Sequence, residues 1–299
     1  MAQDHPLVSV IVAAFQQPVF LNEALRSAAA QTYPNVQIIV VDDASGLEHT
    51  LKYVLPSNAR LIVHDQRAKA AAITRNTGIL AATGEYLAFL DQDDVWLPQK
   101  LAWQVDLMER DPSAVLVFGH FRWVDADLNE LPEQIDPPFL DDPLRQMLFR
   151  NFIECPSQVM VRKSAMDRIG LFDPTIRGTA AWEFYIRAAA AGRMISDPRV
   201  MSLYRQHPAQ WSKDSLMMRK GSARTMEKTA GWIGDVRPEL KMLVRRRWSR
   251  WVREVARAQF SNREERREAM STLMRALKVW PLDMQSYAVM VKGMIARAE

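Results

Sequence analysis

Short, almost wholly apolar runs alternate with helical patterns in the first third of this 299-residue chain. Val8–Ala14, Val36–Val41 and Tyr86–Leu90 have the composition of strands that are covered on both faces. Between the first two runs, apolar residues recur with the spacing of an amphipathic helix, at Leu21, Ala24, Leu25 and Ala28. Strand, helix and strand in this order predict an α/β fold with a mostly parallel, Rossmann-like sheet flanked by helices.

The same reading predicts the remaining elements. Strands are expected at Arg60–His64, Ala114–Phe118, Gln158–Val161 and Val200–Tyr204. Helices are expected at Ala70–Ala82, Pro98–Glu109, Ser164–Gly170 and Trp182–Ala191. Asp125–Pro143 is polar and carries prolines, so it is predicted to be a long loop, and loops of that length are usually functional or disordered.

Strand signals largely disappear after Leu216, which predicts a boundary near Ser215. We therefore expect one domain over residues 1–215 and a helical extension over residues 216–299. The sequence contains no uninterrupted run of 18 or more apolar residues, so we expect no membrane-spanning helix. Met1–Pro6 lacks the apolar core of a signal peptide, which favours the cytoplasm.

Three carboxylates lie within four residues, at Asp91, Asp93 and Asp94, directly after the last of the three apolar runs. Buried without a cation, they would repel one another and favour protonation, whereas Mg²⁺ or Mn²⁺ suits hard oxygen ligands. The end of a strand is also where open α/β sheets bind ligands. The alternative is a solvated acidic turn beside a helix N-terminus. Asp42 and Asp43 end the second run and are either a helix cap or a ligand contact.

The single cysteine, Cys155, has no partner for an internal disulfide and no cluster of metal ligands around it in the sequence. We expect it to be a small buried residue.

The charge of the chain is divided unevenly. Arg219–Glu299 carries 19 basic and 9 acidic residues, a net charge of +10, whereas Met1–Met218 carries 20 and 26, a net charge of −6. A basic tail suggests an anionic surface as partner, membrane or nucleic acid. No nucleic-acid partner is expected, because the tail has no recognisable fold signature of that kind and the remaining chain is acidic.

Three apolar stripes run through the tail. They are Leu240, Val244, Trp248, Trp251 and Val255; Met270, Leu273, Met274 and Leu277; and the segment Tyr287–Ile295. Two interpretations stay open. The stripes pack on the preceding domain or on a second copy in a homodimer, or the arginine-rich helices lie on an anionic membrane surface. The second would make the protein peripheral on the inner face of the cytoplasmic membrane.

Four segments together resemble family 2 glycosyltransferases of the GT-A fold: Val8–Ser45, Thr74–Gly78, Ala82–Leu101 and Gly170–His207. Four motifs in the right order are far more specific than one. The resemblance implies an enzyme that binds a nucleotide-diphosphate sugar at the carboxyl edge of the sheet. It also implies a divalent cation, Mn²⁺ or Mg²⁺, that neutralises the leaving diphosphate, and inversion as the acceptor hydroxyl attacks the anomeric carbon.

The resemblance implies a nucleotide-sugar site formed by Ala13, Ala14, Phe15, Asp42, Asp43, Arg75, Asp91 and Gln92. The backbone of the first three residues would line the nucleotide pocket, and Asp42 would accept a hydrogen bond from the base. Arg75 would face the diphosphate or orient the acidic stretch, for which a guanidinium is suited. The structural alternative for Arg75 is a salt bridge on a helix surface.

By the same resemblance, Asp93 is the principal metal ligand, with Asp91 close to the ribose or the metal. His207 would reach the metal or the diphosphate, although a single histidine is often only structural. Asp94 is expected to cap the helix that follows.

One departure from the family pattern concerns the general base. Members usually carry Glu-Asp directly before the tryptophan of the stretch that reads Ala180–Tyr185 here, and that Asp is the expected base. This chain has Ala181, which cannot take a proton. Glu183 lies two positions further, about 200° around a helix, so it could substitute only if this turn is not helical. Glu154 and Asp173 are more distant candidates.

The leading hypothesis is a metal-assisted, inverting glycosyltransferase of cell-envelope polysaccharide or glycoconjugate synthesis, with a saccharide or lipid-linked acceptor. The pathway is implied by the resemblance alone. The alternative is a donor-binding protein or a disabled variant without turnover, because Ala181 stands at the position of the base.

Overall fold

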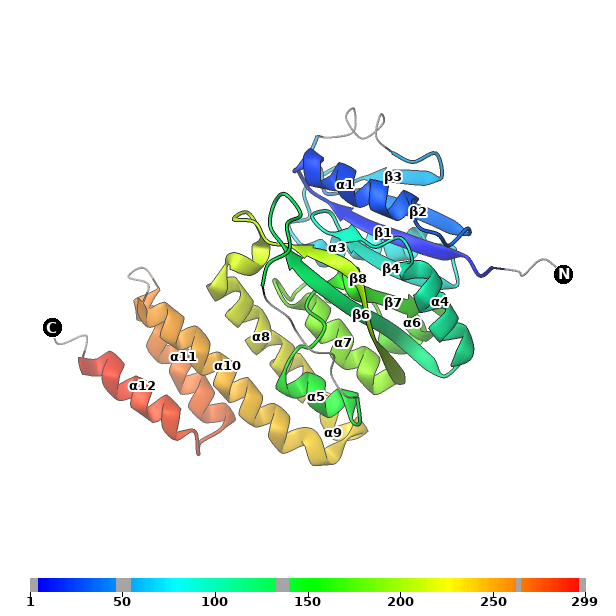
Figure 1. Ribbon diagram of the computed structural model, residues 1–299. Helices are drawn as coiled ribbons and strands as arrows, with labels where there is room; N and C mark the ends of the chain where they lie inside the picture. The colour runs from blue at the N-terminus through cyan, green and yellow to red at the C-terminus, as the bar shows by residue number, and fades with distance from the viewer. Residues whose placement is uncertain (1–4, 47–54, 133–139, 262–264, 296–299) are drawn as a thin grey trace. The chain divides into compact units, whose positions relative to one another are not determined.

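The computed structural model describes residues 5–46, 55–132, 140–261 and 265–295 (Figure 1). Contacts divide the chain into two units. The first consists of Met1–Pro143, Asn151–Pro174 and Arg187–Pro208. The second consists of Leu144–Arg150, Thr175–Ile186 and Ala209–Glu299. The division of the chain into domains at Ser215 stays a prediction; helix α8 begins at that residue.

The first unit is built on one sheet. Its strands are β1 (Val8–Ala14), β2 (Val36–Asp42), β3 (Ala59–Val63), β4 (Tyr86–Asp91), β5 (Val95–Trp96), β6 (Ala114–Val124), β7 (Val159–Arg162) and β8 (Arg193–Arg205). They lie in the order β3-β2-β1-β4-β7-β6-β8-β5. The pairs β1–β2, β1–β4, β2–β3 and β6–β8 are parallel, and β4–β7, β6–β7 and β5–β8 are antiparallel. The predicted α/β fold is confirmed, with a sheet that is mixed.

Helices cover both faces of the central strands (Figure 1). Alternate residues of β1, such as Val10 and Val12, pack in one core with α1 (Pro18–Ala29) and α4 (Lys100–Arg110). Between them, Ile11 points to the opposite face, where α3 (Ala71–Ala81) packs. Strands buried on both faces need apolar residues at successive positions, which explains the uninterrupted apolar runs.

A glycine sets how closely α3 approaches β1. A Cβ on Gly78 would lie 2.4 Å from the Cγ2 of Ile11, nearer than real Cβ atoms come to any heavy atom. The helix backbone can therefore rest directly on the strand only because position 78 has no side chain. This close packing fixes the helix that carries Arg75.

Two strands differ from the predictions in length, and one was not predicted. β6 extends to Val124, and β8 starts at Arg193, because the two strands pair over most of their lengths with irregular register near Gly119 and His120. β5 is only two residues long and pairs with β8, more than 100 positions later in the chain. The predicted short helix near residue 164 divides into η2 (Lys163–Ala165) and α6 (Met166–Ile169).

The second unit is helical. It contains most of α5 (Pro143–Phe149), the start of α7 (Ala180–Ala191), and α8 (Ser215–Ala230), α9 (Ile233–Val236), α10 (Lys241–Ser261), α11 (Arg266–Val279) and α12 (Met284–Ile295). Single 3₁₀ turns complete the chain at η1 (Pro156–Gln158), η3 (Trp211–Lys213) and η4 (Pro238–Leu240). The apolar stripes of the tail are only partly buried in this unit: Val244, Leu273 and Val289 are buried, whereas Met274, Tyr287 and Val291 are exposed. Ala256, Leu273 and Val289 form a shared core of the last three helices.

A buried ion pair joins α10 to the turn before α12. Arg253 donates to Asp283 at 2.5 Å, and the two side chains are 6% and 10% exposed. Ser249 and Ser286 also donate to Asp283, at 2.9 and 2.8 Å. Burial alone would raise the pKa of Asp283, but the two serine hydroxyls and the Arg253 charge outweigh it, so the pKa is lowered.

Among the helices of the described ranges, none combines the length and the apolar character that crossing a bilayer requires.

Candidate active site

Three strands of the first unit end at one edge of the sheet and bring the predicted acidic residues together. In the strand register, Ala14 of β1 is opposite Asp42 of β2, and Ala13 is opposite Asp91 of β4. Backbone hydrogen bonds continue past the strand ends, from Asp43 N to Ala14 O at 2.9 Å. Since β2 and β4 lie on opposite sides of β1, this edge is the point where the strand order reverses.

Gln92 holds the loop after β1 with both ends of its amide. Its Oε1 accepts from the backbone N–H of Phe15 at 2.6 Å, and its Nε2 donates to the Phe15 carbonyl at 2.9 Å. Gln16 and Gln17, which follow, have φ values of 54° and 59°, a conformation that non-glycine residues seldom adopt. On the other side, the Arg67 guanidinium lies 3.8 Å from the centre of the Phe15 ring. Arg67 was not among the predicted residues.

Asp42 and Asp43 order the loops around them. Asp42 is fully buried and accepts from the backbone N–H and the hydroxyl of Ser45. Asp43 accepts from the N–H groups of Ala68 and Lys69, at 2.6 and 3.2 Å, and lies 3.2 Å from His64 Nδ1. Both carboxylates therefore cap turns at this edge. Their contact with a ligand stays a prediction.

Arg75 of α3 points at the acidic stretch. Its Nη2 lies 2.5 Å from Oδ1 of Asp91. Burial and the charge of Asp93 raise the pKa of Asp91, although Arg75 opposes the shift. The structure therefore pairs Arg75 with the acidic stretch, and both roles inferred for Arg75 toward a donor stay predictions.

The expectation that Asp94 caps the following helix is wrong. Helix α4 begins at Lys100, after Gln99, and no side chain caps it. Asp94 is instead fully buried and accepts from the Ser157 hydroxyl at 2.5 Å and from the Arg205 N–H at 3.2 Å. Burial and the charges of the neighbouring aspartates raise its pKa well above the usual range.

Arg205 is the principal residue that sequence reasoning missed. Its side chain is fully buried at the end of β8 and donates to the Asp93 carbonyl at 2.8 Å. The same guanidinium donates to the Ala126 carbonyl and to the carboxylate of Glu23, and lies 4.4 Å from the Phe20 ring centre. The sequence does show an arginine two positions before the expected histidine. Its partners are too distant in sequence for its role to be predicted.

His207 lies against the acidic stretch, and its predicted contact with a metal or a diphosphate stays a prediction. Its Nε2 lies 3.0 Å from Oδ2 of Asp93, and its ring is 5.1 Å from that of Phe20. Within the described residues, no group of three or more His, Cys, Asp or Glu side chains is arranged to hold a metal. Magnesium in nucleotide sites is commonly held by one or two carboxylates together with phosphate oxygens. Asp91 and Asp93 are of the type that this smaller set needs, and a metal contact of His207 stays a prediction.

The residues at the expected position of the base lie in the second unit. Ala181 and Glu183 both belong to the first turn of α7, and Glu183 is 4% exposed. Because the turn is helical, the two side chains point about 200° apart, and the condition under which Glu183 could replace the missing carboxylate is not met. The roles of both residues stay predictions. Cys155, expected to be buried, is buried.

Comparisons with known proteins agree on one family. The model of Glycosyl transferase family 2 matches residues 9–170. An uncharacterized glycosyltransferase of Rickettsia typhi is 27% identical over 71% of this chain and 67% of its own length. The Escherichia coli UDP-Glc:alpha-D-GlcNAc-diphosphoundecaprenol beta-1,3-glucosyltransferase WfgD is 32% identical over 40% of this chain and 47% of its own length.

Solved structures show the same fold. A crystal structure of S. aureus TarS in complex with UDP superposes with a TM-score of 0.66, at 17% identity, over 92% of this chain and 81% of that one. The complex of TarS with UDP-GlcNAc gives a TM-score of 0.69 at 16% identity, over 91% and 81%. The fold is therefore that of the GT-A glycosyltransferases. Since the family model covers more than half of its residues, the chain belongs to glycosyl transferase family 2.

Proposed function

We propose that this protein transfers a sugar from a nucleotide-diphosphate sugar to a hydroxyl group of a saccharide or lipid-linked acceptor, with inversion and with help from a divalent cation. The observation that carries the proposal is the convergence of Asp42, Asp91 and Asp93 with Arg75 and His207 at the carboxyl edge of the sheet. The resemblance to family 2 glycosyltransferases implies that the donor binds at this edge. Open α/β sheets in general also bind their ligands there.

The donor end of the site supports a uridine nucleotide as the first candidate. The E. coli relative is named for UDP-Glc, and the TarS structures contain UDP and UDP-GlcNAc. In this chain, Phe15 with Arg67 over its ring offers a flat surface beside the loop that Gln92 holds, and Asp42 ends the neighbouring strand. The backbone of Ala13 and Ala14 would line the same pocket.

Asp93 and His207, with Asp91 beside them, would hold the cation, Mn²⁺ or Mg²⁺. When bound, the cation would neutralise negative charge on the diphosphate. Arg75 keeps Asp91 oriented, and Arg205 fixes the backbone at Asp93, so the carboxylates are positioned before any ligand arrives. The raised pKa values of the buried Asp94 and the partly buried Asp91 also favour a cation nearby, since positive charge would relieve their repulsion.

The acceptor and the cellular setting are inferred from one relative's name and from the charge of the tail. The name of the E. coli relative contains a lipid diphosphate acceptor, and the last 81 residues of this chain carry a net charge of +10. Both fit envelope polysaccharide or glycoconjugate synthesis by an enzyme held at the inner face of the cytoplasmic membrane. The general base is not assigned, because Ala181 occupies the position where the resemblance places it.

The test is a calorimetric titration with UDP, GDP and dTDP, each with Mn²⁺ and with a chelator. We expect one nucleotide, UDP first, to bind with Mn²⁺ and to lose at least about tenfold in affinity with chelator, as is usual for a metal that bridges protein and phosphate. Asp93→Asn should abolish the metal dependence. Asp106→Asn, a half-exposed carboxylate on α4 outside the site, is the matched control. A folded protein that binds none of the three would refute the proposal.

The second candidate is a protein that binds the donor without turnover, and Ala181 is the observation that favours it. It predicts nucleotide binding as above, with no release of UDP from a bound UDP-sugar in the presence of any acceptor. Transfer at a measurable rate by the unaltered chain would exclude it.

A further inference from the structure

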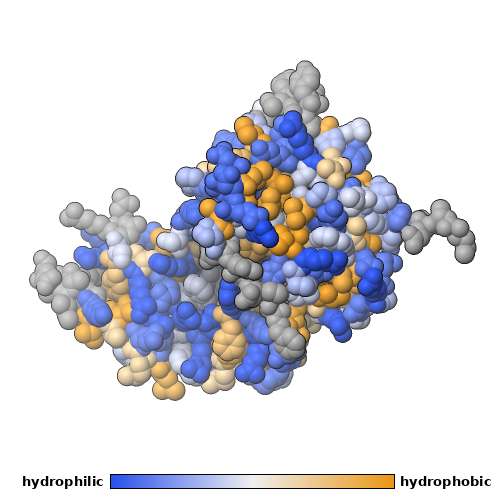
Figure 2. Space-filling model, viewed as in Figure 1, coloured by the Kyte–Doolittle hydropathy of each residue, from blue (hydrophilic) through white to orange (hydrophobic). Residues whose placement is uncertain are grey.

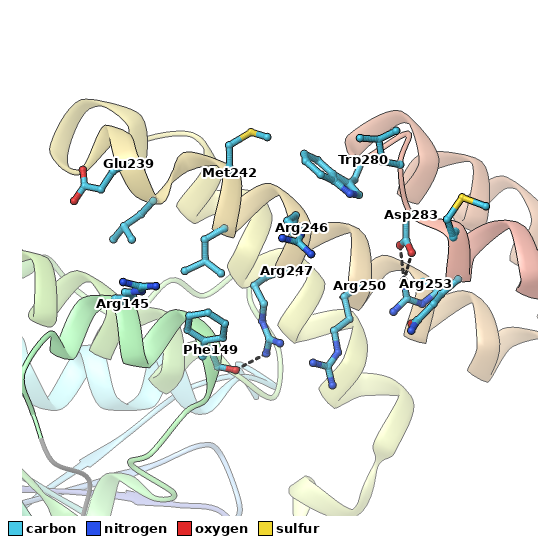
Figure 3. A pocket seen from close by; sticks show the side chains of 15 residues that line it. Arg145, Phe149, Glu239, Met242, Arg246, Arg247, Arg250, Arg253, Trp280 and Asp283 are labelled. Carbon is cyan, nitrogen blue, oxygen red and sulfur yellow. Dashed lines mark hydrogen bonds and ion pairs between the residues drawn. The ribbon is translucent and has the colours of Figure 1, made fainter.

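A cavity of about 820 Å³ opens within the second unit, on the side chains of α5, α10 and the turn between α11 and α12 (Figure 3). Its lining is unusual in charge. Five arginines line it, against two acidic residues: Arg145, Arg246, Arg247, Arg250 and Arg253 against Glu239 and Asp283. Asp283 is already committed to Arg253, and Glu239 lies beside Arg237. The cavity therefore holds a surplus of guanidinium groups.

Four of these arginines, Arg246, Arg247, Arg250 and Arg253, lie on consecutive turns of α10. Arg246 and Arg250 are exposed, and neither has an acidic side chain within salt-bridge distance among the described residues. Arg247 donates to the Phe149 carbonyl, but its Nε is buried with no hydrogen-bond partner in the described part of the chain. Burial and the charge of Arg250 lower the pKa of Arg247. These like charges repel one another, and an anion that accepts hydrogen bonds would offset that repulsion.

The remaining walls are apolar. Leu282 and Met284 line the cavity while 74% and 73% exposed, and Met242 is 53% exposed. Trp280 stands on the same side, with the Arg246 guanidinium 5.9 Å from its ring centre. In the face that Figure 2 presents, hydrophobic and hydrophilic residues are interleaved over α10, α11 and α12. Exposed apolar side chains around a charged cavity suit a ligand with a polar head and an apolar tail.

We propose that this cavity binds the phosphate headgroup of an anionic amphiphile, with Arg246, Arg247 and Arg250 on the phosphate oxygens and Leu282 and Met284 against the start of the alkyl chain. Guanidinium groups match phosphate geometry with paired hydrogen bonds, whereas a zwitterionic headgroup would set its own cation against the arginines. An anion without a tail, such as inorganic diphosphate, would use only half of the site.

The experiment measures binding of three soluble probes by calorimetry: dihexanoyl phosphatidic acid below its micellar concentration, dihexanoyl phosphatidylcholine, and inorganic diphosphate. We expect phosphatidic acid to bind at least about tenfold more tightly than either of the others, because only it satisfies both the arginines and the apolar wall. Leu282→Asn should weaken the binding of phosphatidic acid and leave the binding of diphosphate unchanged.

The key variant is Arg246→Ala/Arg250→Ala, which should reduce binding of phosphatidic acid by at least about tenfold. Its control is Arg245→Ala/Arg266→Ala, which removes the same charge from two exposed residues that do not line the cavity. All four side chains are exposed, so neither variant disturbs packing. If both double variants lose the same affinity for phosphatidic acid, the binding depends only on net charge, and the proposal is overturned. Diphosphate binding as tight as phosphatidic acid would also overturn it.

An amphiphile with a phosphate head belongs to the same chemical class as a lipid-linked acceptor, and a link between the two rests on the function proposed above. The probes contain no nucleotide and no sugar. Failure of the nucleotide titration with this cavity intact, or the reverse, would therefore separate the two proposals.

Discussion

Gln92 uses both ends of its side-chain amide on one backbone unit of a neighbouring loop. Gln92→Glu keeps an oxygen for the Phe15 N–H but sets a carboxylate against the Phe15 carbonyl. We expect a loss of about 1 kcal/mol in unfolding free energy, the lower end of the cost of an unsatisfied group because this one is only partly buried, and roughly tenfold weaker nucleotide binding. Urea denaturation and calorimetry measure the two effects. Gln99→Glu, an exposed site with the same change of charge, should leave nucleotide binding unchanged and should not lower the unfolding free energy, because a carboxylate is favourable at the N-terminus of α4.

Ala181 defines a gain-of-function prediction. If the resemblance places the base correctly, Ala181→Asp should raise the rate of sugar transfer at least about tenfold, since a general base contributes 10²–10⁴-fold. Nucleotide affinity should stay the same, because only proton transfer is altered. The measurement is UDP release from a donor in the presence of acceptor. An unchanged rate with unchanged affinity would contradict this position for the base.

The predictable part of the site was the part encoded locally. Asp91, Asp93 and Asp42 could be placed because each follows an apolar run, and runs that alternate with helices end at one edge of a sheet. Asp94 could not, because its partners Ser157 and Arg205 come 63 and 111 residues later. Nothing near a carboxylate in sequence distinguishes a helix cap from a buried acceptor of distant hydrogen bonds.

At the scale of elements, the fit of α3 on β1 depends on Gly78. Gly78→Ala adds a methyl group 2.4 Å from Ile11 Cγ2, and overpacking of this kind costs about 1–3 kcal/mol, more than alanine gains in helix propensity. Gly234, where a Cβ would come no nearer than 3.5 Å to Lys241, is the control, and Gly234→Ala should be neutral or stabilising. Thermal unfolding of the two variants decides. A stable Gly78→Ala protein would show that the helix can shift without loss.

The ion pair between α10 and the turn before α12 should make stability depend on pH. The folded pKa of Asp283 is below its unfolded value of about 3.9, so its contribution is complete above that pH and is lost as pH falls through the folded pKa. At neutral pH, Asp283→Asn leaves the buried Arg253 with only the more distant carboxylate of Glu254, 3.8 Å from its Nε, and should cost about 3 kcal/mol. The difference from the unaltered protein should shrink below about pH 4.

The exposed pair of Glu130 and Arg122 supplies the control, because its side chains are more than half exposed. Glu130→Gln should cost about 1 kcal/mol or less at any pH. Urea titrations from pH 3 to pH 7 compare the two variants, and a constant effect of Asp283→Asn over that range would contradict the role assigned to the pair.

Elements defined by their own periodicity were predicted within a few residues, and elements defined by pairing were not. β1, β2 and β4 follow from their apolar runs. β5 has two residues and exists because Val95 and Trp96 lie against β8. The later part of β6 mixes polar and aromatic residues, and only its partner strand keeps it extended to Val124.

For the molecule as a whole, the uneven charge predicts how it behaves at surfaces. The last 81 residues carry a net charge of +10 and the preceding 218 a net charge of −6. The protein should sediment with anionic vesicles at low ionic strength and be released at high salt, because screening shortens the range of the attraction. Vesicles of zwitterionic lipid are the control. Equal binding to both kinds of vesicle would reject electrostatic attachment.

The fully buried guanidinium of Arg205 also has a consequence for synthesis of the chain on the ribosome. The strands β1, β2 and β4 emerge early, but Asp94 accepts from a residue 111 positions later, and Asp93 contacts one 114 positions later. A nascent chain can therefore form the central sheet long before its acidic stretch acquires Arg205 and His207. During elongation these carboxylates lack both partners, and the acidic edge of the sheet is completed only when β8 has left the exit tunnel.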